Sequence, residues 1–361
     1  MMQQFFTVGP SQLHPKYELF WQESYRNQVG SISHRSQQFR DIYRFTEEQL
    51  RILLSLTPEH NIYFTPSATE IWERMLLNVV EHTSFHLVNG SFSKRFYEFS
   101  ALLGKQNLCF EVSQGQGFDD VTTIEIPSVA ELICTTQNET SSGIQIPVED
   151  LDSLKDHHPH ALICTDIVSS APYAAVNFKK MDMAFFSVQK AFGLPPGLGV
   201  WIVNHASLKK AADLKHKGIL QGAHHTLESF ENNHLKWETP STPNIMAIDV
   251  LGKMAAHMNT IGIEQIRKDT EEKFQMLKHF EASHPGVRYT TTKDAHLSRT
   301  VCVWTCEKNP KDILEKMKAR QYVLAGGYGA GQAEQIRIAN FPSSSLEDME
   351  KMLQCLSEVI S

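Results

Sequence analysis

Long apolar runs, closely paired cysteines and an excess of basic charge are all missing from this sequence. No apolar run is long enough to cross a bilayer, so we expect no membrane-spanning helix. The formal net charge is -7, which gives no general attraction to nucleic acid or to an anionic membrane. The six cysteines contain no CxxC pair, and several lie in apolar runs where a cysteine acts as a small hydrophobe. We therefore expect neither nucleic acid nor a membrane as a partner.

Signals for secretion and for metal binding are weak as well. The N-terminus lacks a basic region followed by a long apolar core, so we expect no signal peptide and a cytoplasmic protein. There are 17 histidines, but the dense clusters at 157–160 and 224–225 lack the helical spacing with a carboxylate that zinc hydrolases use. Cys302 and Cys306 would share one face of a strand, and a metal site there would need further ligands. We expect no metal.

Helical and strand-like segments alternate from about residue 37 to residue 215 of this 361-residue chain. Such alternation predicts an α/β fold whose mainly parallel sheet is covered by helices on both faces. The expected helices are 37–54, 67–80 and 91–103, and the expected strands are 61–65, 84–88, 107–112, 130–135, 161–165, 183–187 and 199–203.

A second, smaller unit is expected toward the C-terminus. One long helical pattern runs from Asn244 to about His279, with Gly252 and Gly262 inside it. Fewer and more separated strands follow, which favours a small α+β domain. We place the large domain at 16–245 and the small domain at 246–361 together with 1–15. The expected elements of the small unit are strands near 287–290, 300–304, 322–324 and 335–339 and helices at 311–319 and from 345.

Lys190 stands where an apolar run opens into a loop rich in glycine and proline. A lysine held at such a strand end is partly desolvated, which disfavours its ammonium form. A neutral amine in that position can form a Schiff base with an aldehyde. The alternative is a strand-end lysine whose head group lies in water.

A second residue favours the catalytic interpretation. Asp166 ends the apolar run 161–165, which is typical of a buried parallel strand. Ligands of α/β sheets bind beyond these carboxyl ends, so Asp166 and Lys190 can face one site. Pyridoxal phosphate needs this pair, because the lysine holds its aldehyde and the carboxylate keeps the pyridine nitrogen protonated. Capping of the next turn is the alternative role for Asp166.

Two further segments suit the same cofactor. Ser67 opens a helix after a strand and a turn, and a helix start presents N–H groups to a phosphate. Ser67 with Glu70 also fits a capping box, and the two interpretations are compatible. Phe92 follows another strand at the mouth of a helix, where an aromatic ring can stack on a pyridine ring. Core packing is the alternative for Phe92.

Taken together, these motifs resemble the class V aminotransferases of fold type I, and within that class the phosphoserine aminotransferases. The resemblance covers nearly the whole chain, and it depends on the order and spacing of motifs that are individually weak. The motifs are Gly9-Pro10, Ser33-His34-Arg35-Ser36 with Phe39, 90–95, Asn138-Glu139-Thr140 with Gly143, Asp166 before Ser169-Ser170, Gln189-Lys190, Thr239-Pro240, and Arg337-Ile338 with Asn340.

The resemblance implies a homodimer with shared active sites and a role for each matching residue. Lys190 would carry the Schiff base and Asp166 would pair with the ring nitrogen. Phe92 would stack on the ring, and Thr140 would bond near its hydroxyl group. The remaining roles are cofactor phosphate binding by Ala68, Thr69 and Gln189 with Thr239 from the partner, substrate phosphate binding by His34 and Arg35, and α-carboxylate binding by Arg337.

Several residues depart from the family pattern. The family's phosphate-binding turn is usually richer in glycine than 65–69, and tryptophan is usual where Phe92 stands. Glu238 replaces an asparagine before Thr239, and a carboxylate beside a phosphate is repulsive unless it points away or pairs with a base. The His-Arg pair usual before the carboxylate-binding arginine is replaced by the glycine-rich segment 326–331, which we interpret as a lid.

The sequence therefore predicts a pyridoxal-phosphate aminotransferase that acts on an amino acid and a 2-oxo acid. The expected reaction converts phosphoserine and 2-oxoglutarate to 3-phosphooxypyruvate and glutamate, in serine biosynthesis. One alternative is a serine–pyruvate or alanine–glyoxylate enzyme whose substrate carries no phosphate. A cysteine desulfurase would need a cysteine on a mobile loop, whereas Cys306 ends an expected strand. The last alternative is a non-catalytic binding protein of the same fold.

Overall fold

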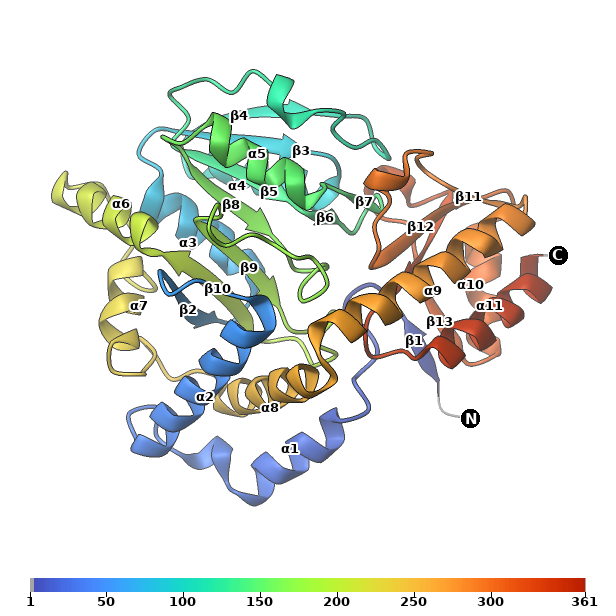
Figure 1. Ribbon diagram of the computed structural model, residues 1–361, viewed down its shortest axis with the longest axis horizontal. Coiled ribbons are helices and arrows are strands. Elements are labelled where there is room, and N and C mark those ends of the chain that lie inside the picture. The colour runs from blue at the N-terminus through green and yellow to red at the C-terminus, as the bar shows by residue number, and fades with distance from the viewer. Residues whose placement is uncertain (1–2, 361) are drawn as a thin grey trace.

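Two β-sheets organise the computed structural model, which describes residues 3–360 of the chain (Figure 1). The larger sheet has seven strands, and β10 runs antiparallel to both of its neighbours while the remaining pairs are parallel. In spatial order its strands are β2 (His60–Thr65), β10 (Gly199–Asn204), β9 (Met183–Ser187), β8 (Leu162–Asp166), β5 (Leu132–Thr136), β3 (Thr83–Val88) and β4 (Gln106–Glu111).

The smaller sheet has five strands and lies on the right of Figure 1, next to both chain ends. Its first strand comes from the N-terminus and pairs in parallel with β13, so the two ends of the chain meet in one unit. In spatial order its strands are β1 (Gln4–Phe6), β13 (Tyr322–Gly326), β14 (Gln335–Ala339), β12 (Val301–Cys306) and β11 (Val287–Tyr289). A hairpin of β6 (Asn138–Glu139) and β7 (Ile144–Gln145) stands apart from both sheets.

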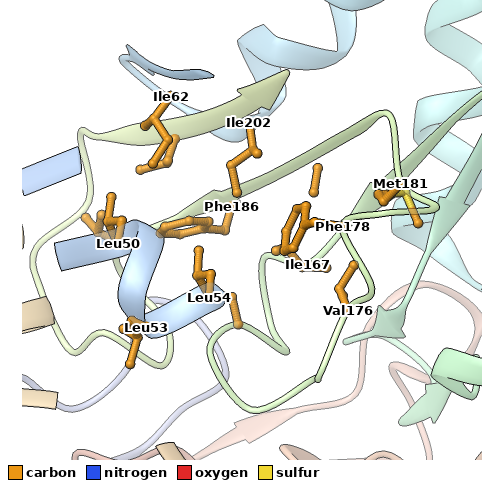
Figure 2. Packing of buried hydrophobic residues seen from close by; sticks show 14 of the residues in the cluster. Leu50, Leu53, Leu54, Ile62, Ile167, Val176, Phe178, Met181, Phe186 and Ile202 are labelled. Carbon is orange, nitrogen blue, oxygen red and sulfur yellow. The ribbon is translucent and has the colours of Figure 1, made fainter. Parts of the chain in front are cut away.

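Helices cover both faces of the large sheet. The strands alternate accordingly: Ile202 and Phe186 point into one core, while Trp201 and Phe185 point into the other. Figure 2 shows Phe186 and Ile202 in the first core, beside Leu50 of α2. The helices associated with this sheet are α1 (Tyr17–Arg26), α2 (Gln37–Leu54), α3 (Ala68–Val79), α4 (Ser91–Leu102), α5 (Val148–His157), α6 (His205–His216), α7 (Leu227–His234) and α8 (Ile245–Ile261).

Three helices belong to the smaller sheet and its core. They are α9 (Ile263–Ser283), α10 (Pro310–Ala319) and α11 (Leu346–Ile360). The division into 16–245 and 246–361 with 1–15 stays a prediction, and residues 1, 2 and 361 of these ranges lie outside the described part. Across the described residues, no helix is both long enough and apolar enough to span a membrane.

The expected fold class is confirmed, with one correction. The pattern from Asn244 to His279 is not one helix, because Gly262 ends α8 and α9 begins directly after it. Gly262 has φ +89°, and its N–H donates to the carbonyl of Met258. A left-handed glycine of this kind is a common helix terminator. No bounds were predicted from the sequence for α1, α5, α6, α7, β1, β6 or β7.

Candidate active site

The site lies at the carboxyl edge of the large sheet, where neighbouring strands deliver Lys190 and Asp166. Lys190 follows β9 in a tight turn in which the Gly193 N–H donates to the Lys190 carbonyl at 2.9 Å. The lysine is 8% exposed, and its Nζ donates to Thr140 Oγ1 at 2.8 Å. Nζ also lies 5.3 Å from the centre of the Phe92 ring.

Burial lowers the pKa of Lys190 to about 8. The carboxylates of Asp166 and Glu139 oppose this change, and the guanidinium of Arg337 adds to it. A fraction of the amine is therefore neutral near physiological pH, in the form that attacks an aldehyde. The expectation of a desolvated lysine agrees with this environment.

Asp166 is the last residue of β8 and is 5% exposed. One of its oxygens accepts the Val168 N–H at 2.8 Å. Burial raises the pKa of Asp166 to about 7, while the Val168 N–H and Lys190 work against that rise. The carboxyl group of Asp166 can therefore accept a hydrogen bond from a protonated ring nitrogen. The positive charge of that nitrogen would lower the pKa of Asp166 again and favour its ionised form.

Gly9 forms part of the wall around the lysine. Its backbone has φ +142°, and a Cβ built on it would lie 2.8 Å from Lys190 Cε. The neighbouring Ser11 hydroxyl donates to the Lys190 carbonyl at 2.7 Å. The segment after β1 therefore packs directly on the lysine side chain. Sequence reasoning noted Gly9 only as part of a motif, because nothing local indicates this distant contact.

Glu139 is a fully buried carboxylate that organises the other side of the site. It accepts the backbone N–H groups of Phe92 at 3.1 Å and of Ser93 at 2.9 Å. It also accepts the N–H of Ser141 at 3.0 Å and the hydroxyl groups of both serines. These bonds fix the start of α4, and with it Phe92, next to the turn that carries Thr140. The sequence analysis did not assign this role to Glu139.

The turn that was predicted to bind the cofactor phosphate forms the capped start of α3. Ser67 caps the helix by accepting the Glu70 N–H at 3.2 Å, and the Ala68 N–H donates to Ser187 Oγ at 2.9 Å. The Glu70 side chain makes a 2.5 Å contact with His225 Nδ1. A reciprocal capping box would instead need this side chain to accept the Ser67 N–H, so only the Ser67 half of the expected box is formed. Thr69 is half-buried in the first turn.

Arg337 approaches the same site from β14 of the small sheet. Its Nε donates to the Gly326 carbonyl at 2.7 Å and its Nη1 donates to the Thr140 carbonyl at 3.3 Å. The side chain is largely buried, and burial lowers its pKa. Within residues 3–360, Nη2 has no hydrogen-bond partner, so one end of the guanidinium is available for a carboxylate.

The remaining predicted residues form a second group. The Arg35 Nη1 donates to Glu238 at 2.5 Å and to Asn233 at 2.8 Å, and Arg40 bonds the other Glu238 oxygen at 2.6 Å. Burial works to raise the pKa of Glu238, but the two arginines outweigh it and hold that pKa below its ordinary value. The unusual carboxylate is thus accommodated by pairing.

The same group includes His34 and Thr239. His34 Nδ1 lies 3.2 Å from Thr242 Oγ1, and Thr239 donates to the Ser241 carbonyl at 2.8 Å. Thr239 also lines a cavity of about 220 Å³ together with Thr65. Within residues 3–360, no hydrogen bond or ion pair connects His34 or Arg35 with Lys190 or Arg337.

Gln189 precedes Lys190 in the turn after β9. The Gln189 carbonyl accepts the Ser11 N–H at 2.9 Å, and its side chain is half-buried beside Lys190. Over residues 3–360, no three histidine, cysteine or acidic side chains gather in a way that could hold a metal ion.

The residues present fit pyridoxal phosphate. Lys190 offers a buried amine of lowered pKa, and Asp166 offers a buried carboxyl group that lacks a cationic hydrogen-bond partner in the described structure. Phe92 offers a ring face beside the amine. At the start of α3, the N–H groups of Ala68 and Glu70 donate to Ser187 and Ser67, which leaves the Thr69 N–H for a phosphate within the described structure.

Comparison with known proteins agrees with this geometry. The family model for class V aminotransferases matches residues 109–335. A crystal structure of a phosphoserine aminotransferase from Cytophaga hutchinsonii is 42% identical over 99% of both chains, with a TM-score of 0.97. The phosphoserine aminotransferase of Rhodococcus opacus is 25% identical over 99% of this chain and 95% of its own length.

More distant structures share the fold alone. An alanine–glyoxylate aminotransferase from Nostoc is 16% identical, with a TM-score of 0.82 over 100% of this chain and 96% of its own. The expected resemblance to the class is confirmed by the family match and the 42% identical relative. This chain therefore belongs to the class V aminotransferase family and is an aminotransferase that depends on pyridoxal phosphate.

Proposed function

We propose that this enzyme converts phosphoserine and 2-oxoglutarate to 3-phosphooxypyruvate and glutamate, a step of serine biosynthesis. The observation that carries the proposal is the presence of two separate guanidinium anchors. Among residues 3–360, Arg337 is buried beside Lys190 with its Nη2 unbonded, and the Arg35 side chain is 42% exposed and forms hydrogen bonds through Nη1 alone. A phosphorylated amino acid has two anionic ends, and each anchor suits one of them. The 42% identical phosphoserine aminotransferase supports the same substrate.

Each site residue has a proposed part in holding the cofactor. Lys190 would hold it through a C=N bond, Asp166 would keep its ring nitrogen protonated, and Phe92 would cover one ring face. Thr140 would bond near the ring hydroxyl. Ala68, Thr69 and Gln189, with Thr239 of the partner subunit, would hold its phosphate. When bound, pyridoxal phosphate withdraws electrons from the substrate Cα and so makes the Cα proton removable.

The chain's own groups would perform the proton transfers. Arg337 would receive the α-carboxylate on its open Nη2 end, which orients the substrate Cα toward Lys190. Once the substrate amino group has replaced Lys190 in the C=N bond, the freed neutral Nζ would take the Cα proton, and the resulting ammonium would donate that proton to the cofactor carbon of the same C=N bond. Burial supports this exchange because it brings the pKa of Lys190 to about 8, near the working pH. Thr140 holds Nζ in place at 2.8 Å.

We also propose that the enzyme is a homodimer in which His34 and Arg35 face the site of the partner. The support is that, within the one chain described, this pair makes its hydrogen bonds to residues 233, 238 and 242 rather than to the Lys190 site. The cytoplasmic location stays a prediction from the sequence.

A serine–pyruvate or alanine–glyoxylate reaction is the second candidate. It is favoured by the segment 326–331, which contains five glycine and alanine residues around Tyr328 and supplies no basic side chain for a substrate phosphate. This candidate keeps the roles of Lys190, Asp166 and Arg337 unchanged, because it differs only at the distal end of the substrate.

Steady-state kinetics of the cofactor-loaded enzyme separate the candidates. We expect kcat/KM for O-phospho-L-serine with 2-oxoglutarate to exceed that for L-alanine with glyoxylate by about a hundredfold. The reason is that only phosphoserine carries a phosphate group that can pair with the Arg35 guanidinium. Arg35→Gln should lower the phosphoserine value about tenfold and leave the alanine value unchanged. The control is Arg320→Gln, whose side chain is 45% exposed and lies in the small unit. A preference for alanine would replace our proposal with the second candidate.

A further inference from the structure

The glycine-rich segment after β13 is folded tightly and presents one large side chain. A Cβ on Gly327 would lie 2.1 Å from the Gly331 carbonyl oxygen, and one on Gly329 would lie 2.2 Å from Ser91 Oγ. Gly329 also has φ +59°. These glycines are therefore needed for close packing of the segment on itself and on the start of α4. The expectation of a mobile lid stays a prediction.

Tyr328, between these glycines, contacts two parts of the active site. Its ring is stacked on the Phe92 ring, with the centroids 5.3 Å apart and the planes 7° from parallel. The Arg337 guanidinium carbon lies 5.4 Å from the centre of the Tyr328 ring. Since Phe92 itself lies 5.3 Å from Lys190 Nζ, one tyrosine links the proposed carboxylate anchor to the proposed cofactor face.

Tyr328 completes the set of contacts that orient Arg337. Gly326 and Thr140 hold Nε and Nη1 through their carbonyl groups, and the tyrosine ring adds a contact with the guanidinium. Two of these contacts, Gly326 and Tyr328, come from one short stretch of chain. Within residues 3–360, the arginine is therefore held without an acidic partner, and its Nη2 makes no hydrogen bond.

We propose that Tyr328 is a positioning residue that acts through its ring, holding Arg337 for the substrate carboxylate and Phe92 for the cofactor. The inference rests on the proposed roles of Arg337 and Phe92, and it does not depend on a phosphate group in the substrate. Both the amino acid and the 2-oxo acid carry the carboxylate that Arg337 would bind. Loss of the ring should therefore weaken the binding of both.

The main test compares Tyr328→Ala and Tyr328→Phe in the cofactor-loaded enzyme. A stacked aromatic pair and a cation–π contact together correspond to about a tenfold change in binding. We expect Tyr328→Ala to raise KM for both the amino donor and the oxo acid about tenfold, with kcat changed less than about threefold. Tyr328→Phe keeps the ring and should stay within about twofold of the wild type. Equal defects in the two variants would overturn the inference.

A matched control separates positioning from general stability. Tyr25 is 60% exposed and is stacked on Trp21 at 5.4 Å and 7°, whereas Tyr328 is 42% exposed. Tyr25→Ala therefore removes an equivalent stack outside the site and should leave both KM values unchanged. A second readout is the dissociation constant of pyridoxal phosphate, which should rise severalfold in Tyr328→Ala because Phe92 loses its support. Unchanged cofactor affinity together with unchanged KM in Tyr328→Ala would contradict the inference.

Arg337→Lys distinguishes failure of the inference from failure of the proposed site. If Arg337→Lys raises both KM values and Tyr328→Ala does not, the inference about Tyr328 is wrong and the proposed role of Arg337 stands. If Arg337→Lys leaves both values unchanged, the proposed role of Arg337 is wrong and the inference falls with it.

Discussion

Gly9 lies so close to the Lys190 side chain that a methyl group on its Cα would come within 2.8 Å of Lys190 Cε. The two residues are far apart in the sequence, and the segment after β1 brings Gly9 to the lysine. Because φ at Gly9 is +142°, an L-residue there is also strained. Together these effects would push the amine out of its position beside Thr140.

We therefore predict that Gly9→Ala weakens cofactor binding by about tenfold or more, since overpacking costs roughly 1–3 kcal/mol. A titration with pyridoxal phosphate, followed by visible absorption, measures this change. Gly262→Ala is the control, because Gly262 also has a positive φ but nothing lies within 4 Å of its added Cβ. Equal cofactor affinity in the two variants would contradict the prediction.

Asp166 should make the cofactor-free protein less stable as the pH rises. Its pKa increases from an ordinary 3.8 to about 7 on folding, so its contribution to stability is fully present below pH 3.8 and is lost as the pH rises to about 7. The loss is roughly 4 kcal/mol at pH 8. Asp166→Asn should therefore raise the Tm of the cofactor-free protein at pH 8, and the gain should shrink toward pH 5. Thermal unfolding at both pH values tests this, and a lower Tm at pH 8 would argue against an uncompensated carboxylate.

Glu139→Ala should destabilise the protein strongly, because three backbone N–H groups would lose their shared acceptor. With 1–3 kcal/mol for each unsatisfied buried group, we expect a loss of about 3 kcal/mol or more in the free energy of unfolding. Urea denaturation measures it. Glu111→Ala removes a 48% exposed carboxylate that pairs with Lys94, and it should cost less than about 1 kcal/mol. If both variants were equally stable, Glu139 would not organise the start of α4.

The residues that sequence reasoning identified share a local signature. Lys190 and Asp166 each follow an apolar run at a strand end, so the pattern of a buried sheet indicated both residues and their common edge. Phe92 was indicated by its place after a strand at the start of a helix, and Arg337 was found through a family motif. The expected helix 37–54 matches the observed bounds of α2 because Ser36 caps its start and Ser55 ends it in the left-handed region.

The residues that were missed depend on contacts between distant parts of the chain. Glu139 meets the start of α4 across 47 positions. Pairing of Glu238 with a base was one of the two expected outcomes, but its partner Arg35 lies 203 positions away and was not predicted. The role of Tyr328 depends on two distant contacts, the Phe92 ring of α4 and the Arg337 guanidinium of β14. Pattern and spacing report local structure, and they carry no information about which distant side chain receives a carboxylate or a ring.

A lowered pKa does not by itself identify the lysine that holds the cofactor, because a second buried lysine shares this property. Burial also lowers the pKa of Lys273 to about 8, the value found for Lys190. Lys273 Nζ, however, donates to the carbonyl groups of Phe341 and Ser344 at 2.8 Å, which gives it a structural role. Its surroundings therefore separate it from Lys190, whose Nζ faces Thr140 and Phe92.

The most direct test of the account is to identify the lysine that carries the cofactor. The cofactor-loaded enzyme would be reduced with borohydride and digested, and its peptides would be analysed by mass spectrometry. We expect the pyridoxyl phosphate group on the peptide that contains Lys190, and no labelled peptide from Lys190→Ala. Label on Lys273 or another lysine, or an unmodified Lys190, would contradict the account.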